Sequence, residues 1–289
     1  MPELPEVETV ARELRRYLPG LRVGGVVCRY PRVVSTGIEA FQRALRGRTF
    51  IDIGRHGKYL FLSLSGEREV ALHLRMTGQM LLLPRRQPPD GHCHLEILLS
   101  GADRKLVYRD VRKFGRLELL SGSRADFIRD RRLGPDALNL RAERLYDSLR
   151  RTRRCLKAAL LDQRLLAGLG NIYTDEVLFR ERLSPLCRSD SLSLRRVQSL
   201  ALTIRAVLRA ALRRRGTSIS DYVDPGGRRG GYQFVLQAYG REGEACPRCG
   251  TAIVRSIVAG RGTWTCPRCQ RSGAPHWTAR GFGATVGGG

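Results

Sequence analysis

Two Cys-Pro-Arg-Cys pairs constrain the fold of this chain more than any other feature of its sequence. Each pair forms a tight knuckle, and two knuckles on a β-hairpin supply the four thiolates of a closed, tetrahedral zinc site. Because protein ligands fill all four positions, none is left for a catalytic water, so the expected zinc ion is structural. The alternative is a redox or free-thiol role. The four expected ligands are Cys246, Cys249, Cys266 and Cys269, with sixteen residues between the pairs.

The other cysteines are scattered singly, which favours a reducing compartment over a disulfide framework. They are Cys28, Cys93, Cys155 and Cys187. No apolar run approaches the ~20 residues that a membrane-spanning helix needs. The acidic, amphipathic beginning of the chain is also unlike a signal peptide. We therefore expect an intracellular protein with no membrane partner.

The charge balance indicates a polyanionic partner. The 289 residues include 52 Lys and Arg against 27 Asp and Glu, which gives a net charge of +25. An excess of this size, supplied mostly by arginine, favours nucleic acid over a membrane surface. The length allows about two domains.

The first eight residues, Met-Pro-Glu-Leu-Pro-Glu-Val-Glu, carry the candidate chemistry. Removal of Met1 makes Pro2 the amino terminus, with a secondary amine. An α-amino group has a pKa near ~7.7–8.0, against ~10.4 for lysine, so far more of it is free base at neutral pH. Its attack on the anomeric carbon of a sugar gives an iminium that keeps its positive charge without proton transfer and serves as an electron sink. Glu3 is the adjacent carboxyl that would carry protons.

The same segment is also typical of a helix start. Pro5 suits the first helical turn and Glu6 suits the positive end of the helix dipole. Apolar residues from Val7 to Leu18 follow at helical spacing. The two interpretations are compatible, because a helix that begins beside the amine helps to lower the pKa of that amine.

Strands are expected first and helices afterwards. Short apolar runs between glycine turns fill residues 23–120, which favours a β-sandwich or barrel. The strand segments are 23–30, 59–64, 70–74, 94–99 and 106–108. After a boundary near residues 133–135, helical patterns cover 152–166, 171–181 and 194–214. The glycine-rich segment 217–232 is expected to be a long mobile loop.

Four further segments combine residues suited to nucleic acid, and each has a purely structural alternative. The sequence Gly-Leu-Gly-Asn at 168–171 offers free amides to a phosphate, or is only a helix cap. Arg261, between two glycines at the expected hairpin tip, would hold a phosphate or be solvated. Arg-Lys-Phe-Gly at 112–115 would wedge into a base stack, or Phe114 would belong to the core. Lys58 lies in an expected hairpin turn, where a lysine is usually solvated.

Together these segments resemble the formamidopyrimidine-DNA glycosylases, the bacterial base-excision enzymes for oxidised purines. The resemblance runs from Met1 to about Gln270. The resemblance rests on the opening octapeptide, on residues 260–270, which include the second cysteine pair, and on five further segments. These are 57–60, 73–78, 110–115, 168–173 and 239–243.

The resemblance implies an α+β fold. An N-terminal β-sandwich with an opening helix would be followed by a helical helix–two-turns–helix module and a C-terminal zinc-ribbon finger. We expect a catalytic β-sandwich domain at 1–133 and a linker at 134–150. A helix–two-turns–helix domain with a lesion-capping loop would then occupy 151–235, with the zinc finger at 236–272 and a disordered tail at 273–289.

The resemblance also implies a bifunctional DNA glycosylase/AP lyase that removes 8-oxoguanine and formamidopyrimidines through a Schiff base at Pro2 and β,δ-elimination. Glu3 would be the general acid/base and Lys58 would act in β-elimination. Arg261 would hold a phosphate and assist the δ step. One structural zinc ion would be the cofactor.

Its implied partner is double-stranded DNA that contains oxidised bases or abasic sites, bound by a monomer in the cytoplasm on the bacterial nucleoid. Met76, Arg112 and Phe114 would fill the gap left by the extruded nucleotide. The residues implied to hold the DNA backbone are His73, His92, Arg153, Lys157 and Asn171.

The sequence departs from the family pattern in few places. Val111 and Lys113 replace the proline and second arginine of Asp-Pro-Arg-Arg-Phe-Gly, which bears on the rigidity of the wedge, and Cys93 replaces a common acidic residue. The nearest alternative is the endonuclease VIII type, which acts on oxidised pyrimidines and usually opens Met-Pro-Glu-Gly-Pro-Glu, so Leu4 favours the purine branch. An alternative of another class is a non-catalytic zinc-ribbon protein that binds nucleic acid by charge.

Overall fold

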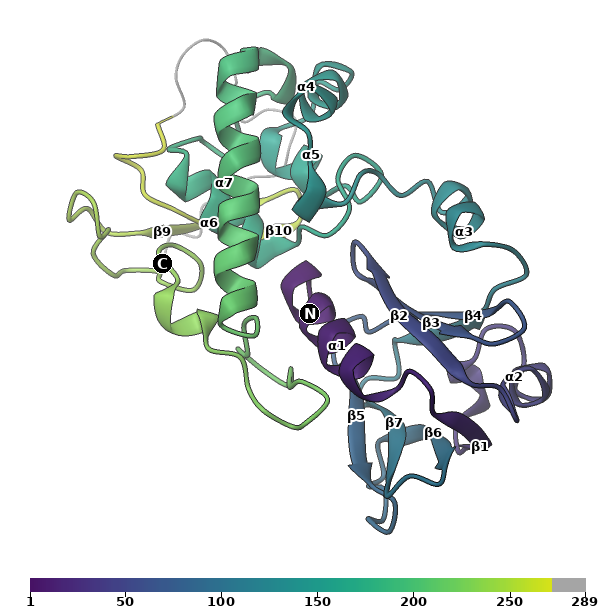
Figure 1. Ribbon diagram of the computed structural model, residues 1–289. Coiled ribbons are helices and arrows are strands. Elements are labelled where there is room, and N and C mark those ends of the chain that lie inside the picture. Colours follow the sequence, from purple (N-terminus) through teal and green to yellow (C-terminus); the bar gives the residue numbers. More distant parts are fainter. Residues whose placement is uncertain (272–289) are drawn as a thin grey trace. The chain divides into compact units, whose positions relative to one another are not determined.

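The computed structural model describes residues 1–271 of the chain, which form two compact units (Figure 1). The first unit comprises Met1–Arg132 and Ala211–Gln233, and the second comprises Leu133–Ala210 and the chain from Phe234 onward. Within residues 1–271, no helix has the length and apolar character needed to cross a membrane. The expected disordered tail, 273–289, lies outside the described residues.

Two four-stranded antiparallel sheets form the sandwich of the first unit, as the strand pattern predicts. Their strand orders are β1-β6-β7-β5 and β2-β3-β4-β8. Leu60 and Leu62 of β3 share one apolar cluster with Leu95 and Ile97 of β6, so the core lies between the sheets. The strands are β1 (Arg22–Cys28), β2 (Phe50–His56), β3 (Tyr59–Leu64), β4 (Arg68–His73), β5 (Gly78–Pro84), β6 (Cys93–Ser100), β7 (Arg104–Asp110) and β8 (Arg116–Leu119).

Helix α1 (Leu4–Tyr17) begins where the opening octapeptide predicts, with Pro5 in its first turn. Val7 and Leu14 lie on one face of the helix, are fully buried and belong to the sandwich core. Burial of one Val or Leu side chain contributes roughly 1.5–3 kcal/mol. The apolar face of α1 therefore fixes the amino-terminal residues on the first unit.

Two short helices of the first unit have no counterpart in the sequence prediction. Helix α2 (Ile38–Leu45) buries Phe41 in the sandwich core. Helix α3 (Arg124–Asp130) packs Phe127 edge-on against Phe61 of β3, with 5.6 Å between ring centroids. Helices this short hold too few apolar residues to show a period in a window of 11–18 residues.

The segment 217–232, expected to be a mobile loop, is instead tied to the first unit by many contacts. The buried carboxylate of Asp224 accepts hydrogen bonds from the N–H groups of Gly226 (2.9 Å) and Arg228 (3.0 Å) and pairs with Arg215. A buried carboxylate needs such donors, and they fix the backbone that supplies them. The N–H of Leu82 in β5 donates to the carbonyl of Pro225 (2.8 Å). Residues Ala211–Gln233 belong to the first unit, whereas we expected 151–235 to form one domain.

The second unit combines helices with a β-hairpin. The expected linker at 134–150 holds α4 (Ala142–Arg150). The helix expected at 152–166 is confined to α5 (Leu156–Leu161), because the carboxylate of Asp162 binds the following backbone and ends it. The predictions for 171–181 and 194–214 are close to α6 (Asn171–Arg180) and α7 (Leu194–Arg213). The hairpin consists of β9 (Val254–Val258) and β10 (Arg261–Thr265).

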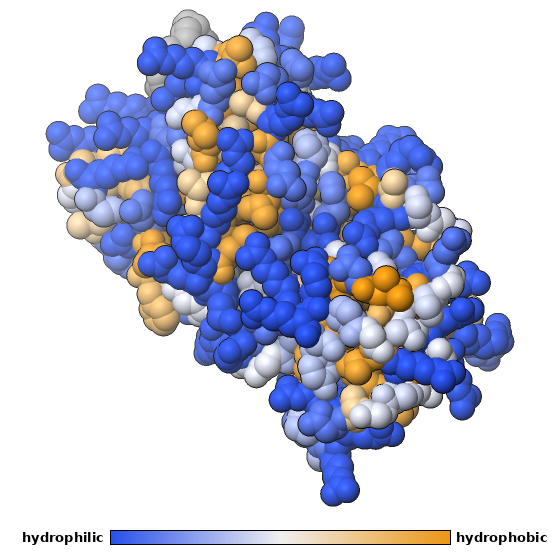
Figure 2. Space-filling view, viewed as in Figure 1, coloured by the Kyte–Doolittle hydropathy of each residue, from blue (hydrophilic) through white to orange (hydrophobic). Residues whose placement is uncertain are grey.

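Hydrophilic residues predominate on the face shown in Figure 2, with hydrophobic residues visible in patches between them. The net charge of +25 comes from residues of this hydrophilic kind. The excess of Lys and Arg over Asp and Glu in the sequence favours a polyanion over a lipid.

Candidate functional site

The amino-terminal segment is fixed where the chain enters α1. Pro2 and Glu3 are buried, whereas the side chain of Met1 is 48% exposed. The N–H of Glu3 donates to Oε2 of Glu6 (2.8 Å), and the N–H of Val7 donates to the carbonyl of Glu3 (3.1 Å). These bonds hold the candidate nucleophile and its neighbouring carboxyl at one end of the helix.

Glu6 is a contributor to the site that the sequence prediction treated only as part of a helix start. Its Oε1 accepts the N–H of Thr217 (2.7 Å), and the hydroxyl of Tyr222 donates to its carbonyl (3.3 Å). One buried glutamate therefore connects Glu3 to the beginning of the segment 217–232. The signal in the sequence is the glutamate three residues after Glu3, the spacing of a capping box.

Lys58 lies in the tight turn between β2 and β3 and is buried, so the interpretation of a solvated turn lysine is wrong. Arg55 ties this turn to α1. Its Nε donates to Oε2 of Glu8 (2.7 Å) and its Nη1 donates to the carbonyl of Gly57 (3.0 Å). The turn that carries the ammonium group of Lys58 is thus anchored to α1, the helix that begins just after Pro2.

His73, at the end of β4, is a neutral hydrogen-bond donor. Burial, together with the positive charges of Arg75 and Lys58, lowers the pKa of its ring to about 3. Nδ1 accepts the N–H of Arg75 (2.9 Å), so the proton of the neutral ring resides on Nε2. The ring also stands edge-on to Tyr59, with 4.7 Å between centroids. An Nε2–H group of this kind can bind a phosphate oxygen without adding charge.

Met76, Arg112 and Phe114 come from two loops of the first unit and lie together; we call them the wedge group. Nη1 of Arg112 donates to Sδ of Met76 (3.1 Å), and the guanidinium lies 4.7 Å from the centroid of the Phe114 ring. Met76 is 42% exposed and Phe114 is 48% exposed, so Phe114 is not a core residue. Exposed apolar side chains beside a guanidinium are suited to contact with bases.

His92 is exposed just before β6, and its carbonyl accepts the N–H of Asp110 (3.0 Å). The adjacent Cys93 is buried and donates to Oδ1 of Asp90 (3.2 Å). Burial raises the pKa of the Cys93 thiol to about 11, so the thiol stays protonated and is a poor nucleophile.

In the second unit, Asn171 contacts the hairpin at the residue after Arg261. Arg261 is exposed at the first position of β10. Nδ2 of Asn171, at the start of α6, donates to the carbonyl of Gly262 (2.8 Å). Arg153 is exposed in the turn that precedes α5. Arg153 and Arg261 therefore lie on the surface of the second unit, where a phosphate can reach them, whereas Asn171 is only partly exposed.

Lys157 does not reach that surface, which corrects the phosphate contact implied for it. Its side chain is 0% exposed. Nζ donates to Oδ1 of Asp175 (2.6 Å), to Oγ1 of Thr263 (2.7 Å) and to the carbonyl of Gly262 (3.0 Å). An ammonium has three protons to donate, and all three are used inside the protein. Lys157 holds the hairpin that carries Arg261.

Two acidic residues of α6 complete this attachment, and the sequence prediction missed both. Oδ2 of Asp175 accepts the N–H of Trp264 (3.2 Å). The carboxylate of Glu176 accepts the backbone N–H groups of residues 237–239 at 2.8 to 3.0 Å. Burial raises the pKa of the Asp175 carboxyl, and the charge of Lys157 opposes that rise. The signal in the sequence was an adjacent Asp-Glu pair in a helix whose other residues are mostly apolar.

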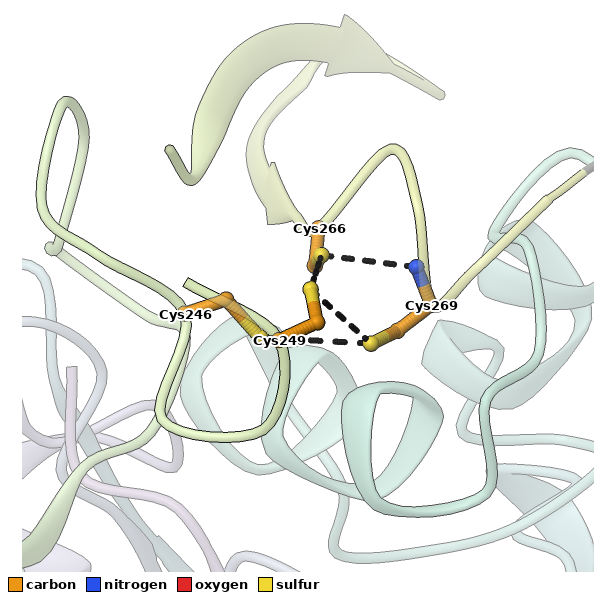
Figure 3. A group of neighbouring side chains, drawn as sticks. All are labelled: Cys246, Cys249, Cys266 and Cys269. Carbon is orange, nitrogen blue, oxygen red and sulfur yellow. Dashed lines mark hydrogen bonds between the residues drawn. The ribbon is translucent and has the colours of Figure 1, made fainter. Parts of the chain in front are cut away.

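The four cysteines of the two knuckles converge at one point of the second unit (Figure 3). Their sulfur atoms all lie within 4.8 Å of one another. The distance from Sγ of Cys249 to Sγ of Cys266, and also to that of Cys269, is 3.5 Å. Ligands about 2.3 Å from a tetrahedral zinc ion lie roughly 3.8 Å apart, so these thiolates fit the metal. They hold one structural zinc ion, as the spacing predicts.

Family models match three successive parts of the chain. Residues 1–117 match the formamidopyrimidine-DNA glycosylase N-terminal domain, and residues 133–223 match the H2TH domain of the same enzymes. Residues 243–271 match the zinc finger found in FPG and IleRS. Together these matches cover well over half of the sequence.

Individual relatives agree with the family models. The formamidopyrimidine-DNA glycosylase of Pelotomaculum thermopropionicum is 40% identical over 275 residues, which cover 94% of this chain and 99% of the relative. The enzyme of the same name from Heliobacterium modesticaldum is 44% identical over 280 residues, with coverage of 94% and 100%.

Solved structures also match this chain over nearly its whole length. The Lactococcus lactis FPG mutant G226P in complex with Fapy-dG-containing DNA has a TM-score of 0.88 and 38% identity, covering 94% of this chain and 100% of that one. MutM in complex with carbocyclic 8-oxo-G DNA has a TM-score of 0.87 and 38% identity, with the same coverage. The chain belongs to the formamidopyrimidine-DNA glycosylase family.

Proposed function

We propose that this enzyme is a bifunctional DNA glycosylase and AP lyase that removes oxidised purines, such as 8-oxoguanine and formamidopyrimidines, from duplex DNA. The observation that carries the proposal is the Pro2–Glu3 segment, fixed at the start of α1 by Glu6. Related structures that contain DNA with Fapy-dG, a carbocyclic 8-oxo-G or an abasic site support this substrate class. The enzyme acts as a monomer on DNA in the bacterial cytoplasm.

The nitrogen of Pro2, freed by removal of Met1, attacks C1′ of the damaged nucleotide. A bond forms between C1′ and this nitrogen while the bond from C1′ to the base breaks, and the base leaves with the electron pair and takes up a proton. The nitrogen then loses its proton, Glu3 delivers a proton to the ring oxygen O4′, and the bond from C1′ to O4′ breaks, which opens the sugar and leaves an iminium between C1′ and the nitrogen. The iminium then withdraws electrons, so that loss of a C2′ proton expels the 3′ phosphate, and a further proton loss expels the 5′ phosphate.

Other residues support these steps. Lys58 acts in the first elimination, and Arg261 holds a phosphate and assists the second. Because C1′ is shielded inside a stacked duplex, the nucleotide must be extruded first, and the wedge group fills the gap. His73, His92, Arg153 and Asn171 hold the backbone; Lys157 is withdrawn from this set because it is buried.

Borohydride trapping tests the proposal. Reduction of a mixture of the protein and an 8-oxoguanine duplex should give a covalent protein–DNA adduct, because borohydride reduces the iminium to a stable amine. A Pro2→Gly variant should lose most excision of 8-oxoguanine, whereas Pro5→Ala, a control in the same segment, should keep it. Intact protein that binds the duplex but never forms an adduct would leave only the non-catalytic zinc-ribbon alternative.

The endonuclease VIII alternative is tested with a second substrate. We expect faster release from an 8-oxoguanine duplex than from a thymine-glycol duplex under single-turnover conditions. A faster reaction with thymine glycol would reassign the enzyme to oxidised pyrimidines and leave the Pro2 chemistry intact.

A further inference from the structure

Asp110, the last residue of β7, is fully buried and lies beneath the wedge group. Register pairs Asp110 with Gly78, the first residue of β5. The loop 74–77 joins β4 to β5, and the loop 111–115 joins β7 to β8. Since β4 pairs with β8 and β5 pairs with β7, the two loops pass side by side from one sheet to the other.

The carboxylate of Asp110 bonds to both loops. Oδ1 accepts the hydroxyl of Thr77 (2.5 Å) from the first loop and the N–H of Arg112 (3.2 Å) from the second. Oδ2 accepts the N–H of Gly115 (2.9 Å) and the hydroxyl of Tyr108 (3.0 Å). Four donors from four residues therefore converge on one carboxylate.

The carboxylate of Asp110 is ionised and closely packed, as an acceptor of four hydrogen bonds requires. Burial raises the pKa of Asp110, but the hydrogen bonds from Thr77, Gly115, Tyr108 and Arg112 outweigh it and leave the pKa lowered. An ionised carboxylate is purely an acceptor, which matches four donors. The surroundings are closely packed, since a Cβ added to Gly115 would lie 1.9 Å from the hydroxyl of Tyr108.

We propose that Asp110 is the positioning residue that holds Met76, Arg112 and Phe114 as a preassembled wedge before DNA binds. The proposal rests on the proposed function, in which the wedge group fills the gap left by the extruded nucleotide. Met76 and Phe114 are apolar and nearly half exposed, so burial does not order them. Asp110 orders the backbone that carries them, through its hydrogen bonds with Thr77, Arg112 and Gly115.

Asp110→Asn is an isosteric change that must break one side of this arrangement. The amide NH2 replaces either Oδ1 or Oδ2, and each of these oxygens accepts one backbone N–H. A hydroxyl can rotate and accept a hydrogen bond instead of donating one, but a backbone N–H cannot. In one orientation of the amide the N–H of Gly115 loses its acceptor, and in the other the N–H of Arg112 keeps only its bond to Oγ1 of Thr77 (3.1 Å). Either orientation weakens the attachment of the second loop.

The test compares two substrates of the full-length protein. On an 8-oxoguanine duplex, Asp110→Asn should slow single-turnover excision by about tenfold or more, because small misplacements of positioning groups have effects of this order. On a single-stranded abasic oligonucleotide no stacked nucleotide has to be extruded, so the borohydride-trapped adduct should form as in the wild type. A 2-aminopurine next to the lesion should lose its fluorescence rise on binding, because the stack is no longer opened.

Further variants keep the result decisive if Asp110→Asn does not fold. Thr77→Val removes one donor to Asp110 and one acceptor of the Arg112 N–H with little change of shape. It should give a weaker loss of the same duplex-only kind, whereas Thr77→Ser should restore activity. Asp52→Asn, the same isosteric change at a half-exposed carboxylate of β2 that pairs with Arg15, is the control and should change the reaction with neither substrate, because an exposed pair contributes little.

Two outcomes overturn the proposal. One is unchanged duplex excision and fluorescence in both Asp110→Asn and Thr77→Val. The other is an equal loss on duplex and single-stranded substrates, which would make Asp110 a general structural residue. Failure of the proposed function is distinguishable, because the wild-type protein itself would then form no adduct with the abasic strand.

Discussion

Lys157 and Asp175 form a fully buried ion pair, with 2.6 Å between Nζ and Oδ1. The same ammonium binds Gly262 and Thr263, the two residues that follow Arg261. The resemblance implied that Lys157 contacts DNA, but the structure shows that Lys157 instead fixes the strand that carries Arg261.

Removal of one partner of this pair should destabilise the second unit strongly. Lys157→Met leaves the Asp175 carboxylate buried without its counter-charge, a change that typically costs about 3–5 kcal/mol. The free energy of unfolding from denaturant titration measures the effect. Arg164→Ala breaks the largely exposed pair with Asp162 and should change stability by less than about 1 kcal/mol. Equal effects of the two variants would contradict the assigned role of the buried pair.

Loss of the zinc ion should unfold the hairpin and weaken DNA binding. A structural zinc site contributes its binding free energy to folding, and here the knuckles flank β9 and β10, where Arg261 begins the second strand. Cys266→Ser should lower both the zinc content and the affinity for lesion DNA, whereas Cys187→Ser, outside the cluster, should change neither. Normal DNA affinity in zinc-free protein would exclude a DNA contact by Arg261.

His73 should make stability depend on pH. Its folded-state pKa is lowered to about 3 from an ordinary value near ~6.5, so below pH ~6.5 the unfolded state binds a proton that the folded state does not. The stability that the neutral ring of His73 contributes is fully present above pH ~6.5 and is lost progressively as the pH falls toward 3. The difference in unfolding free energy between wild type and His73→Asn should therefore shrink over this range. A difference independent of pH would show that the ring is not held neutral.

The salt dependence of binding should separate charged contacts from neutral ones. Neutralisation of about five phosphates by Lys and Arg side chains would give a slope of log affinity against log salt near roughly −4.5. Arg153→Gln should reduce the magnitude of that slope by about 0.9, whereas His73→Gln should lower affinity without changing the slope, because the ring carries no charge. A slope near zero for the wild type would refute the inference drawn from the net charge.

Features of the fold that depend on local patterns could be predicted from the sequence. The start of α1 follows from Pro5 and the apolar spacing after it, and the zinc knuckles follow from the cysteine spacing. Strand β3 has the predicted limits, because a short run of aliphatic residues between turns is itself a strand signal.

Contacts that depend on distant partners could not be predicted in this way. Glu6 looks like a helix-dipole residue until the chain brings Thr217 to it, and Lys157 looks like a surface lysine until Thr263 and Asp175 enclose it. Asp110 belongs to a recognised motif, but its four donors become visible only when the two sheets are assembled. Tertiary packing decides such polar pairings, and no local period encodes them.

The central claim is that the nitrogen of Pro2 forms the covalent bond to the sugar. Mass spectrometry of the borohydride-trapped complex after nuclease and protease digestion tests this most directly. We predict that Met1 is absent and that the peptide beginning at Pro2 carries the deoxyribose remnant on its terminal nitrogen. A remnant on Lys58, or full excision by protein that retains Met1, would contradict the claim.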